Sequence, residues 1–390
     1  MEQVESIDVL IVGSGPAGTS TALHLLQHDQ SWAKRILIVD KAIHPREKLC
    51  GGGITHMGQN ILARLGLTIE TPSFMVREAK IVYGSYSFSF KGNPVFRVIR
   101  RDEFDHWLVQ KAESRGATIR QGEAVLNVTA QEEYVEVKTS KSLIRAKVLV
   151  AADGSRSTVR SKLKWDDDSR VARLLEILTP EDAQKEPEFR EAQAVFDFTP
   201  TSDGLQGYYW DFPSYVGGKS FMNRGVFDSR ARPEQAKIDL VGELRQSLAD
   251  RERDLDDYKL KGHPIRWFDK DGRFAIPHVL LAGDAAGADP LVGEGIAFAL
   301  AYGDVAAASI TNAFEKQDFS FAGYRQRILT HGILKQLPTR TRLARIAYHY
   351  SKYRLLAAIC WRIVGFSIRY SKWKDPEYSP VEAPKLLYES

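Results

Sequence analysis

The chain has 390 residues, of which 43% are hydrophobic and 27% charged, and its formal net charge at pH 7 is +4. This composition is ordinary for a soluble globular protein, and the length predicts two domains or one domain with a large insertion. The two cysteines, Cys50 and Cys360, exclude a disulfide framework and favour a reducing compartment, so we expect a cytoplasmic protein. We expect no secretory leader, and no membrane helix either, because no uninterrupted apolar run reaches about 20 residues.

A dinucleotide-binding pattern opens the chain. Residues 8–12 predict a buried strand, the glycine-rich run 13–18 predicts a turn, and a helix follows. Gly13 permits a tight turn, Gly15 lets the backbone approach a pyrophosphate, and Gly18 lets the helix and strand pack closely. The N–H groups at the start of the helix are suited to phosphates. The next predicted strand ends at Asp40, which can accept hydrogen bonds from a ribose, so the turn predicts a dinucleotide site.

Between residues 41 and 165 the sequence predicts a loop followed by alternating helices and short strands. Apolar residues alternate over 79–98, which is typical of an antiparallel hairpin, with Gly84 and Gly92 as turn residues. The other predicted elements are helices over 55–66 and 101–115 and strands over 118–120, 125–128, 134–138 and 147–152.

A second nucleotide-binding signal follows the strand over 147–152. Asp153 and Gly154 come directly after this apolar run, and a helix with hydroxyl-bearing residues at its start comes next. Ligands of open α/β sheets lie at the carboxyl ends of such strands. Although Asp-Gly is also a common turn, its place behind a glycine fingerprint favours a role in the same site.

Residues from about 165 to 265 form a sheet-rich region inserted between the nucleotide-binding segments. Its predicted strands include 191–198, 207–210 and 218–227, with one helix between 233 and 248. The chain is therefore predicted to divide into a discontinuous nucleotide-binding domain over 1–75, 99–165 and 266–325, a substrate-binding domain over 76–98 and 166–265, and a helical, basic C-terminal region over 326–390.

A third signal follows a predicted strand over 274–282. Gly283 and Asp284 end this strand, and Asp284 is placed to bind the hydroxyls of a ribityl chain. Gly293 and Gly295 would let backbone N–H groups meet a flat ring, and the helix that begins there would stabilise negative charge on a reduced flavin. Tight packing of a helix rich in glycine and alanine explains the small residues, but not the acid and the glycine pair.

These motifs together resemble the FAD-dependent monooxygenase and reductase superfamily built on the p-hydroxybenzoate hydroxylase fold, over about residues 5–330. The resemblance implies a mixed α/β and β architecture: a Rossmann-type FAD-binding domain with an inserted antiparallel-sheet substrate domain and a helical C-terminal tail. Arg101, followed by Phe104, Asp105 and Leu108, matches the arginine helix of that family and implies a contact to FAD. The predicted FAD-binding residues are Gly13, Gly15, Pro16, Ala17, Gly18, Asp40, Lys41, Cys50, Gly51, Gly52, Arg101, Val125, Asp153, Gly154, Gly283, Asp284, Gly293, Gly295 and Ile296.

Two further segments resemble the geranylgeranyl reductase family. Residues 48–54 contain its Cys-Gly-Gly pattern, and residues 207–213 contain part of its Pro-x-x-Tyr-x-Trp-x-Phe-Pro pattern. Leu205 stands where that pattern has its first proline. The residues that match the second pattern, which the resemblance places at the substrate, are Tyr208, Trp210, Phe212 and Pro213.

The resemblance implies reduction of C=C bonds in a polyprenyl substrate by hydride transfer from reduced flavin, with NAD(P)H or reduced ferredoxin as electron donor. Cys50, Tyr208 and Trp210 are the predicted catalytic residues; Cys50 would help to deliver a proton, and the aromatic residues would position an isoprenoid. Cys50 as a small buried filler and the aromatic run as ordinary core are the competing interpretations. The nine histidines show no ligand spacing, so no metal site is predicted.

Two other functions are compatible with these motifs. An oxygen-using hydroxylase or a flavin-dependent halogenase would act on a small apolar or aromatic substrate, and a halogenase would need a lysine such as Lys80 or Lys91 near it. A flavoprotein that binds or assembles without catalysis is the third hypothesis, which the intact glycines and acids disfavour. No feature of the sequence fixes the oligomeric state.

Basic residues gather near the C-terminus. No Asp or Glu falls between residues 325 and 374, and Trp361, Phe366, Tyr370 and Trp373 are interleaved with the basic residues. Peripheral contact with an anionic membrane and a helical tail packed on its own protein explain this pattern equally well. Nucleic-acid binding is not predicted, because no recognition motif accompanies the charge.

Overall fold

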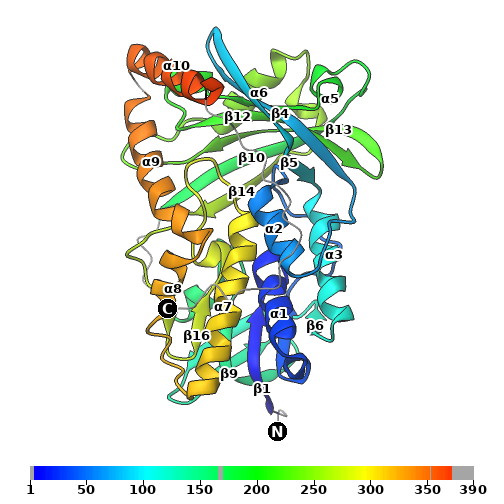
Figure 1. Cartoon of the computed structure of the whole chain (residues 1–390), viewed down its shortest axis with the longest axis vertical. Coiled ribbons are helices and arrows are strands. Elements are labelled where there is room, and N and C mark those ends of the chain that lie inside the picture. The colour runs from blue at the N-terminus through cyan, green and yellow to red at the C-terminus, as the bar shows by residue number, and fades with distance from the viewer. Residues whose placement is uncertain (1–3, 166–169, 352, 371–390) are drawn as a thin grey trace.

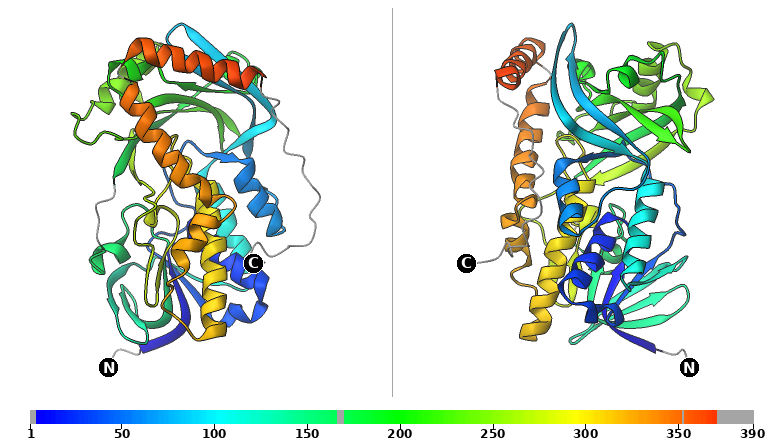
Figure 2. Two further views of the ribbon diagram at one scale, coloured as in Figure 1. Left: turned by 60° about the vertical axis from the view of Figure 1, so that its left-hand side comes forward. Right: turned by 45° about the vertical axis from the view of Figure 1, so that its right-hand side comes forward.

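The computed structural model describes residues 4–165, 170–351 and 353–370. Two eight-stranded sheets lie one above the other along the long axis, and the N-terminal strand starts at the lower end (Figure 1). Helices α8 (Tyr324–Thr330) and α9 (Leu337–Tyr350) climb along one side, and α10 (Arg354–Tyr370) crosses the top (Figures 1 and 2). The last part of the predicted basic C-terminal region, 371–390, lies outside the described residues.

The lower sheet is parallel at its centre, as a nucleotide-binding fold requires. Its order is β15 (Ala275–Ile276), β16 (Val279–Leu281), β9 (Leu143–Ala151), β1 (Val4–Val12), β2 (Ile36–Asp40) and β6 (Thr118–Gln121), and β7 (Val125–Ala130) and β8 (Val135–Thr139) form an antiparallel ribbon beside β9. Helices α1 (Pro16–His28), α3 (Arg101–Ser114) and α7 (Ile296–Lys316) lie side by side along it (Figure 1). The C-terminal halves of β1 and β9, over residues 9–12 and 148–151, are apolar and buried because helices and further strands cover both faces there. This confirms the predicted Rossmann-type domain.

The upper sheet contains the strands of the predicted substrate-binding domain, together with β3 from the segment 1–75 that is predicted to belong to the FAD-binding domain. Its order is β14 (Lys261–Arg266), β10 (Val171–Pro180), β13 (Lys219–Asp228), β12 (Gly207–Val216), β11 (Gln193–Asp197), β4 (Ser73–Tyr83), β5 (Tyr86–Ile99) and β3 (Gly53–Thr55). Neighbouring strands are antiparallel except β11 and β4, which run parallel, so the expected purely antiparallel sheet is corrected at this pair. No hairpin turn joins these two strands, because they come from distant parts of the chain. The remaining α-helices are α2 (His56–Arg64), α4 (Thr158–Lys162), α5 (Pro187–Arg190) and α6 (Leu240–Ala249).

Three local predictions differ from the structure. Gly84 lies in the turn between β4 and β5, as expected, but Gly92 lies inside β5 and is not a turn residue. The single strand expected over 274–282 is a short hairpin of β15 and β16, because Pro277 lacks an N–H and His278 adopts a left-handed φ of +64°. The predicted domain boundary at residue 75 falls inside β4.

Helix α7 is the one described helix whose length and mean hydropathy would allow it to cross a membrane, which the sequence analysis did not anticipate. Its most apolar window is 78% buried inside the protein. Gly303 of α7 packs against Ser20 of α1, where a Cβ on the glycine would lie 2.5 Å from the serine Cβ. Helix α7 is therefore a core helix that α1 covers closely.

Gly303→Val should lower the free energy of unfolding by about 1–3 kcal/mol, because the added side chain forces α1 and α7 apart. Urea denaturation followed by circular dichroism measures this change. Gly323→Val is the matched control, since a Cβ at Gly323 would meet nothing within 4 Å. Equal losses in the two variants would contradict the close α1–α7 contact.

Candidate active site

A cavity of about 620 Å³ lies where the two sheets meet, and residues of both sheets line it. The predicted site residues that line it are Gly13, Gly15, Pro16, Ala17, Asp40, Lys41, Cys50, Gly51, Gly52, Arg101, Val125, Asp153, Gly154, Tyr208, Trp210, Phe212, Gly283, Asp284, Gly293, Gly295 and Ile296. Gly18 and Pro213 do not line it. A Cβ at Gly18 would lie 1.9 Å from the carbonyl oxygen of Gly13, so Gly18 serves the close packing of the turn.

Gly13 closes the turn between β1 and α1. Its φ is +103°, which side chains avoid, and a Cβ there would lie 2.4 Å from the carbonyl oxygen of Ala152. The N–H and hydroxyl of Ser14 donate to Asp40 Oδ2 at 2.7 and 2.8 Å, and the N–H of Ala42 donates to Oδ1 at 2.8 Å. Burial raises the pKa of Asp40, but these hydrogen bonds outweigh burial and leave the pKa below its usual value. Asp40 therefore stays ionised and fixes the turn at the cavity.

Two arginines at the cavity share one buried carboxylate. Arg101 donates to Asp105 through Nε and Nη2, at 2.7 and 2.8 Å, and Arg46 Nη2 lies 3.2 Å from the same carboxylate. Burial lowers the pKa of Arg101, but Asp105 outweighs burial and leaves the pKa above its usual value. A Cβ at Gly15 would lie 3.5 Å from Arg46 Nη2. One carboxylate neutralises one of the two guanidinium groups, so a positive charge remains beside the glycine turn, as a pyrophosphate requires.

Asp153 follows β9 and holds the start of α4. Its Oδ2 accepts hydrogen bonds from the N–H groups of Thr158 and Val159, at 2.7 and 3.2 Å. Its Oδ1 is buried and has no hydrogen-bond partner among the described residues. Burial raises the pKa of Asp153. An unpaired buried oxygen is costly, and a hydroxyl donor on a ligand in the cavity would satisfy it.

Asp284 follows β16 and faces the cavity beside β9. Its Oδ2 accepts a hydrogen bond from Ser155 Oγ at 3.2 Å, which links the two strand ends. Gly283 has a φ of +62°, and a Cβ there would lie 2.7 Å from Ala17 Cβ. Only glycine therefore lets this turn pass so close to α1.

The loop that carries Gly293 and Gly295 is held by buried ion pairs. Arg340 of α9 donates from Nη1 to Asp289 at 2.9 Å, and its Nη2 lies 3.1 Å from Glu294. Thr55 donates to Glu294 at 2.6 Å, and burial raises the pKa of Glu294. The loop leads into α7, whose N-terminus lines the cavity and favours negative charge there.

This geometry fits FAD. The glycine turn and two guanidinium groups suit the pyrophosphate, Asp40 suits the ribose, and Asp153 has an unpaired oxygen for a hydroxyl. Asp284 is placed for the ribityl chain, and the start of α7 would stabilise negative charge on the reduced ring system.

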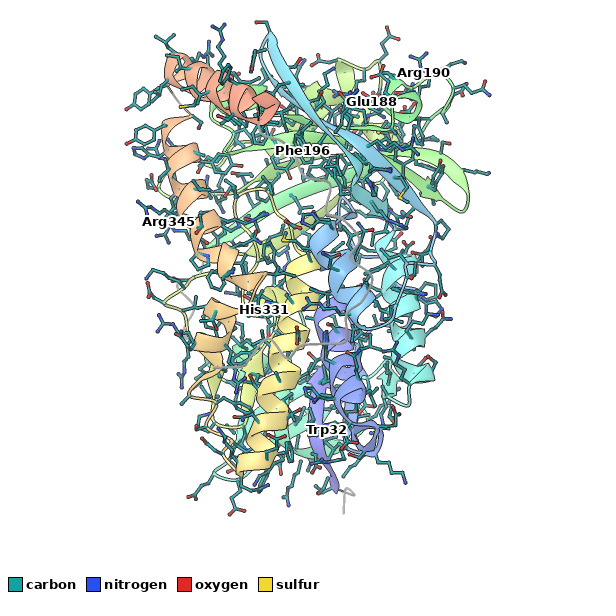
Figure 3. All side chains as sticks on the ribbon, viewed as in Figure 1. Trp32, Glu188, Arg190, Phe196, His331 and Arg345 are labelled. Atoms are coloured by element: carbon teal, nitrogen blue, oxygen red, sulfur yellow. The ribbon has the colours of Figure 1, made fainter. Side chains whose placement is uncertain are left out.

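Aromatic side chains cover the upper side of the cavity. Tyr208, Trp210 and Phe212 alternate along β12 and so face one side of the sheet. Phe196 on β11 lies 5.0 Å from Phe212 and 5.5 Å from Tyr208 between ring centroids, and Figure 3 shows it in the centre of the upper half. The rings that line the cavity, which we call the aromatic wall, are Phe96, Phe196, Tyr208, Trp210, Phe212 and Phe227.

Residues 48–52, which precede β3 and which we call the Cys50 loop, pack directly on this wall. Trp210 donates from its indole N–H to Asn223 Oδ1 at 2.9 Å, and Asn223 Nδ2 donates to the carbonyl oxygen of Cys50 at 3.1 Å. A Cβ at Gly51 would lie 3.2 Å from the ring of Phe212. The structure thus brings together the two segments that resemble geranylgeranyl reductases, although more than 150 positions separate them in the sequence.

The three predicted catalytic residues differ in what their polar atoms do. Tyr208 donates its hydroxyl to the carbonyl oxygen of Val292 at 2.6 Å, and burial raises the pKa of Tyr208. The indole N–H of Trp210 is bonded to Asn223, so both residues offer the cavity a fixed apolar face. The half-buried Cys50 thiol lines the cavity and accepts a 3.4 Å bond from the N–H of Gly52.

Lys48 and His263 form a polar pair at the cavity that the sequence analysis missed. Lys48 Nζ lies 2.7 Å from His263 Nε2, and both residues line the cavity. Burial lowers the pKa of Lys48 to about 8, and burial together with Lys48 lowers the pKa of His263 to about 4. At neutral pH the lysine ammonium therefore donates to a neutral imidazole.

Some of the residues that the sequence analysis missed had a usable sequence signal, and others had none. Arg46 and Lys48 lie in the short loop that follows Asp40, so their closeness to the predicted ribose acid was a usable signal. His263 carried none, because β14 reaches the cavity only in the folded sheet. The two lysines considered for a halogenase do not line the cavity, and Lys91 pairs with Glu78 at 3.4 Å.

The fold and site define a flavoprotein of the FAD-dependent oxidoreductase class. The family model described as "FAD binding domain" matches residues 6–301, and the chain belongs to this family.

The chain is 26% identical over 339 residues to the digeranylgeranylglycerophospholipid reductase of Thermoplasma acidophilum, covering 81% of each chain. A geranylgeranyl bacteriochlorophyll reductase-like structure from Thermoplasma acidophilum has a TM-score of 0.76 and 21% identity over 95% of this chain and 93% of that one. A variant of the halogenase PltM in complex with FAD has a TM-score of 0.68 and 16% identity over 88% of this chain and 76% of that one. The two structural likenesses show a shared fold.

Asp284→Ala should weaken FAD binding by about tenfold or more, because it removes a charged acceptor for the ribityl hydroxyls. Titration of the apoprotein with FAD, followed by flavin fluorescence, measures the dissociation constant. Asp271→Ala is the control, since Asp271 is an exposed partner of Lys270 and Arg325. An unchanged dissociation constant in Asp284→Ala would remove this residue from the FAD site.

Proposed function

We propose that this protein reduces C=C bonds of a polyprenyl substrate of the geranylgeranyl type. The observation that carries the proposal is that the aromatic wall and the Cys50 loop form one side of the cavity whose other side fits FAD. A long isoprenoid suits an apolar aromatic surface, where flat rings position its double bonds and exclude water. The relationship to a digeranylgeranylglycerophospholipid reductase supports the same substrate class.

Reduction of a C=C bond needs a hydride on one carbon and a proton on the other. FAD, when bound and reduced, supplies the hydride. Lys48 Nζ holds a proton that dissociates near pH 8, because burial lowers its pKa, and His263 orients the ammonium from 2.7 Å. Cys50 is held by Asn223 at the edge of the aromatic wall and is the second candidate for delivering the proton. NAD(P)H or reduced ferredoxin would return electrons to the flavin.

The direct test incubates the reduced, FAD-loaded protein without oxygen with geranylgeranyl diphosphate or a prenylated phospholipid. We expect reoxidation of the flavin and a product heavier by two hydrogen atoms for each bond reduced, measured by mass spectrometry. Assays with NADPH and with reduced ferredoxin then identify the donor. An unchanged mass for every polyprenyl substrate would overturn the proposal, and an added oxygen atom in air would indicate a hydroxylase instead.

Lys48→Gln should remove a pH dependence from turnover. Because the pKa of Lys48 is lowered to about 8, its acid form dominates below pH 8 and is lost above it. We therefore expect the wild-type rate to fall as pH rises through about 8, and the rate of the variant to be low without this fall.

The matched control for this variant is Lys185→Gln, since Lys185 is an exposed lysine that does not line the cavity. Its pH profile should equal that of the wild type. A wild-type profile that stays flat through pH 8, or one that Lys48→Gln leaves unchanged, would contradict proton transfer from Lys48.

A further inference from the structure

Helix α10 turns an apolar face away from the protein. Leu355 is 78% exposed and Ile363 60%, and Leu356 and Ile359 are also exposed. At about 100° per residue, these four side chains lie within an arc of about 100° on the helix. An outward apolar stripe of this kind is unusual on a soluble surface and marks a contact site.

The inner face of α10 fixes this orientation. Trp361 lies on the opposite side of the helix, 4.6 Å from Phe198 and 6.3 Å from Tyr83 between ring centroids. A Cβ at Gly365 would lie 2.3 Å from the hydroxyl oxygen of Tyr86, so the helix backbone rests directly on the β4–β5 hairpin. The apolar stripe therefore points outward because its own opposite face is anchored.

Helix α9 exposes apolar side chains as well. Leu343, Ile346 and Tyr350 are exposed and follow one another at the spacing of one helix face. Together, α9 and α10 form an outer edge of the molecule (Figure 2). We call the outward side chains of Leu343, Ile346, Tyr350, Leu355, Leu356, Ile359 and Ile363 the α9–α10 face.

Positive charge accompanies the α9–α10 face. Arg342, Arg345 and Arg362 are exposed, and Figure 3 shows Arg345 at the outer side of α9. None of these three takes part in an ion pair among the described residues. Since residues 325–374 contain no acidic residue, two copies meeting through this face would bring like charges together. An anionic lipid surface is complementary to both the apolar stripe and the arginines.

The inner sides of the same helices contact residues that lie next to the cavity lining. Phe198 lies 4.6 Å from Trp361 and 5.0 Å from Tyr208 between ring centroids, so one ring, Phe198, connects Trp361 of α10 to the aromatic wall. Tyr348 of α9 donates its hydroxyl to the carbonyl oxygen of Leu291 at 2.7 Å, in the loop that leads to Gly293. The α9–α10 face is thus attached to the parts of the protein that surround the cavity.

We propose that the α9–α10 face docks on the surface of an anionic lipid bilayer, with the α10 stripe in the headgroup region and the arginines at the lipid phosphates. Docking would place the aromatic wall next to the membrane, where an apolar substrate is held. This inference goes beyond the proposed function, because it concerns where the protein binds and holds for any substrate of the cavity.

The test is sedimentation of the full-length, FAD-loaded protein with vesicles of phosphatidylcholine alone or mixed with phosphatidylglycerol. We expect binding to the anionic vesicles and at least tenfold weaker binding to the neutral ones. The variant Leu355→Glu/Ile359→Glu/Ile363→Glu should lose binding to both. The variant Arg342→Gln/Arg345→Gln/Arg362→Gln should weaken binding to the anionic vesicles by about fivefold for each arginine.

The matched control is Leu126→Glu/Val241→Glu/Leu260→Glu, which makes the same charge change at three exposed apolar residues outside α9 and α10. It should bind anionic vesicles like the wild type, and retained flavin absorbance shows that every variant is folded. The proposal is overturned if the wild type binds no vesicles, or if the control loses binding equally. It is also overturned if the wild type is a dimer by light scattering and binds no vesicles, while the variant Leu355→Glu/Ile359→Glu/Ile363→Glu is a monomer. A second copy of the chain would then cover the α9–α10 face. Vesicle binding without polyprenyl reduction would leave docking intact and reject only the proposed function.

Discussion

The parallel register of three neighbouring strands is the constraint on which the site depends. β1 pairs with β9 so that Val12 lies beside Ala151, and β16 pairs with β9 so that Leu281 lies beside the same residue. The three strands therefore end at one level, and the residues that follow them meet. A Cβ at Gly13 would overlap the carbonyl oxygen of Ala152, so the turn after β1 approaches the end of β9 as closely as a backbone allows. Distant sequence motifs become a single FAD-sized site through this alignment.

Hydrogen bonds and ion pairs hold the upper sheet and α9 against the loops that complete the cavity. The bond from Trp210 to Asn223, and from Asn223 to the Cys50 carbonyl, fixes the glycine loop against the sheet. On the other side, Arg340 ties α9 to Asp289 and Glu294 in the loop before α7. The apolar wall and the charged half of the cavity are thereby held at fixed positions, which is what a reaction between a flavin and an apolar chain requires.

The FAD side of the site was predictable from local sequence because each part of it is a short motif with its own chemistry. The Gly13 turn, Asp153 and Asp284 each follow an apolar strand, and parallel strands bring such ends together. His263 and Phe196 were not predictable in this way, because they reach the cavity through strand pairing between distant segments. Glycine is common both in turns and at irregular positions of strands, so the sequence does not show that Gly92 lies inside β5.

The direction in which neighbouring strands pair was also not predictable from the sequence. Alternating apolar residues identify β4 and β11 as strands, but alternation carries no information about the direction of the partner strand. Their parallel pairing follows from the path of the chain between them. Likewise, the buried partner Asp105 explains why two arginines can lie beside one turn, a relation that appears only when α3 packs against the loop that carries Arg46.

A crystal structure of the FAD-loaded protein soaked with a polyprenyl compound would show whether the flavin and the apolar chain occupy the two halves of this cavity. We expect a pyrophosphate beside the glycine turn and Arg46, a ring system that reaches the Cys50 loop, and an isoprenoid chain along the aromatic wall. A flavin bound elsewhere, or a ring system separated from the aromatic wall by protein, would show that the two halves of the cavity do not form one active site.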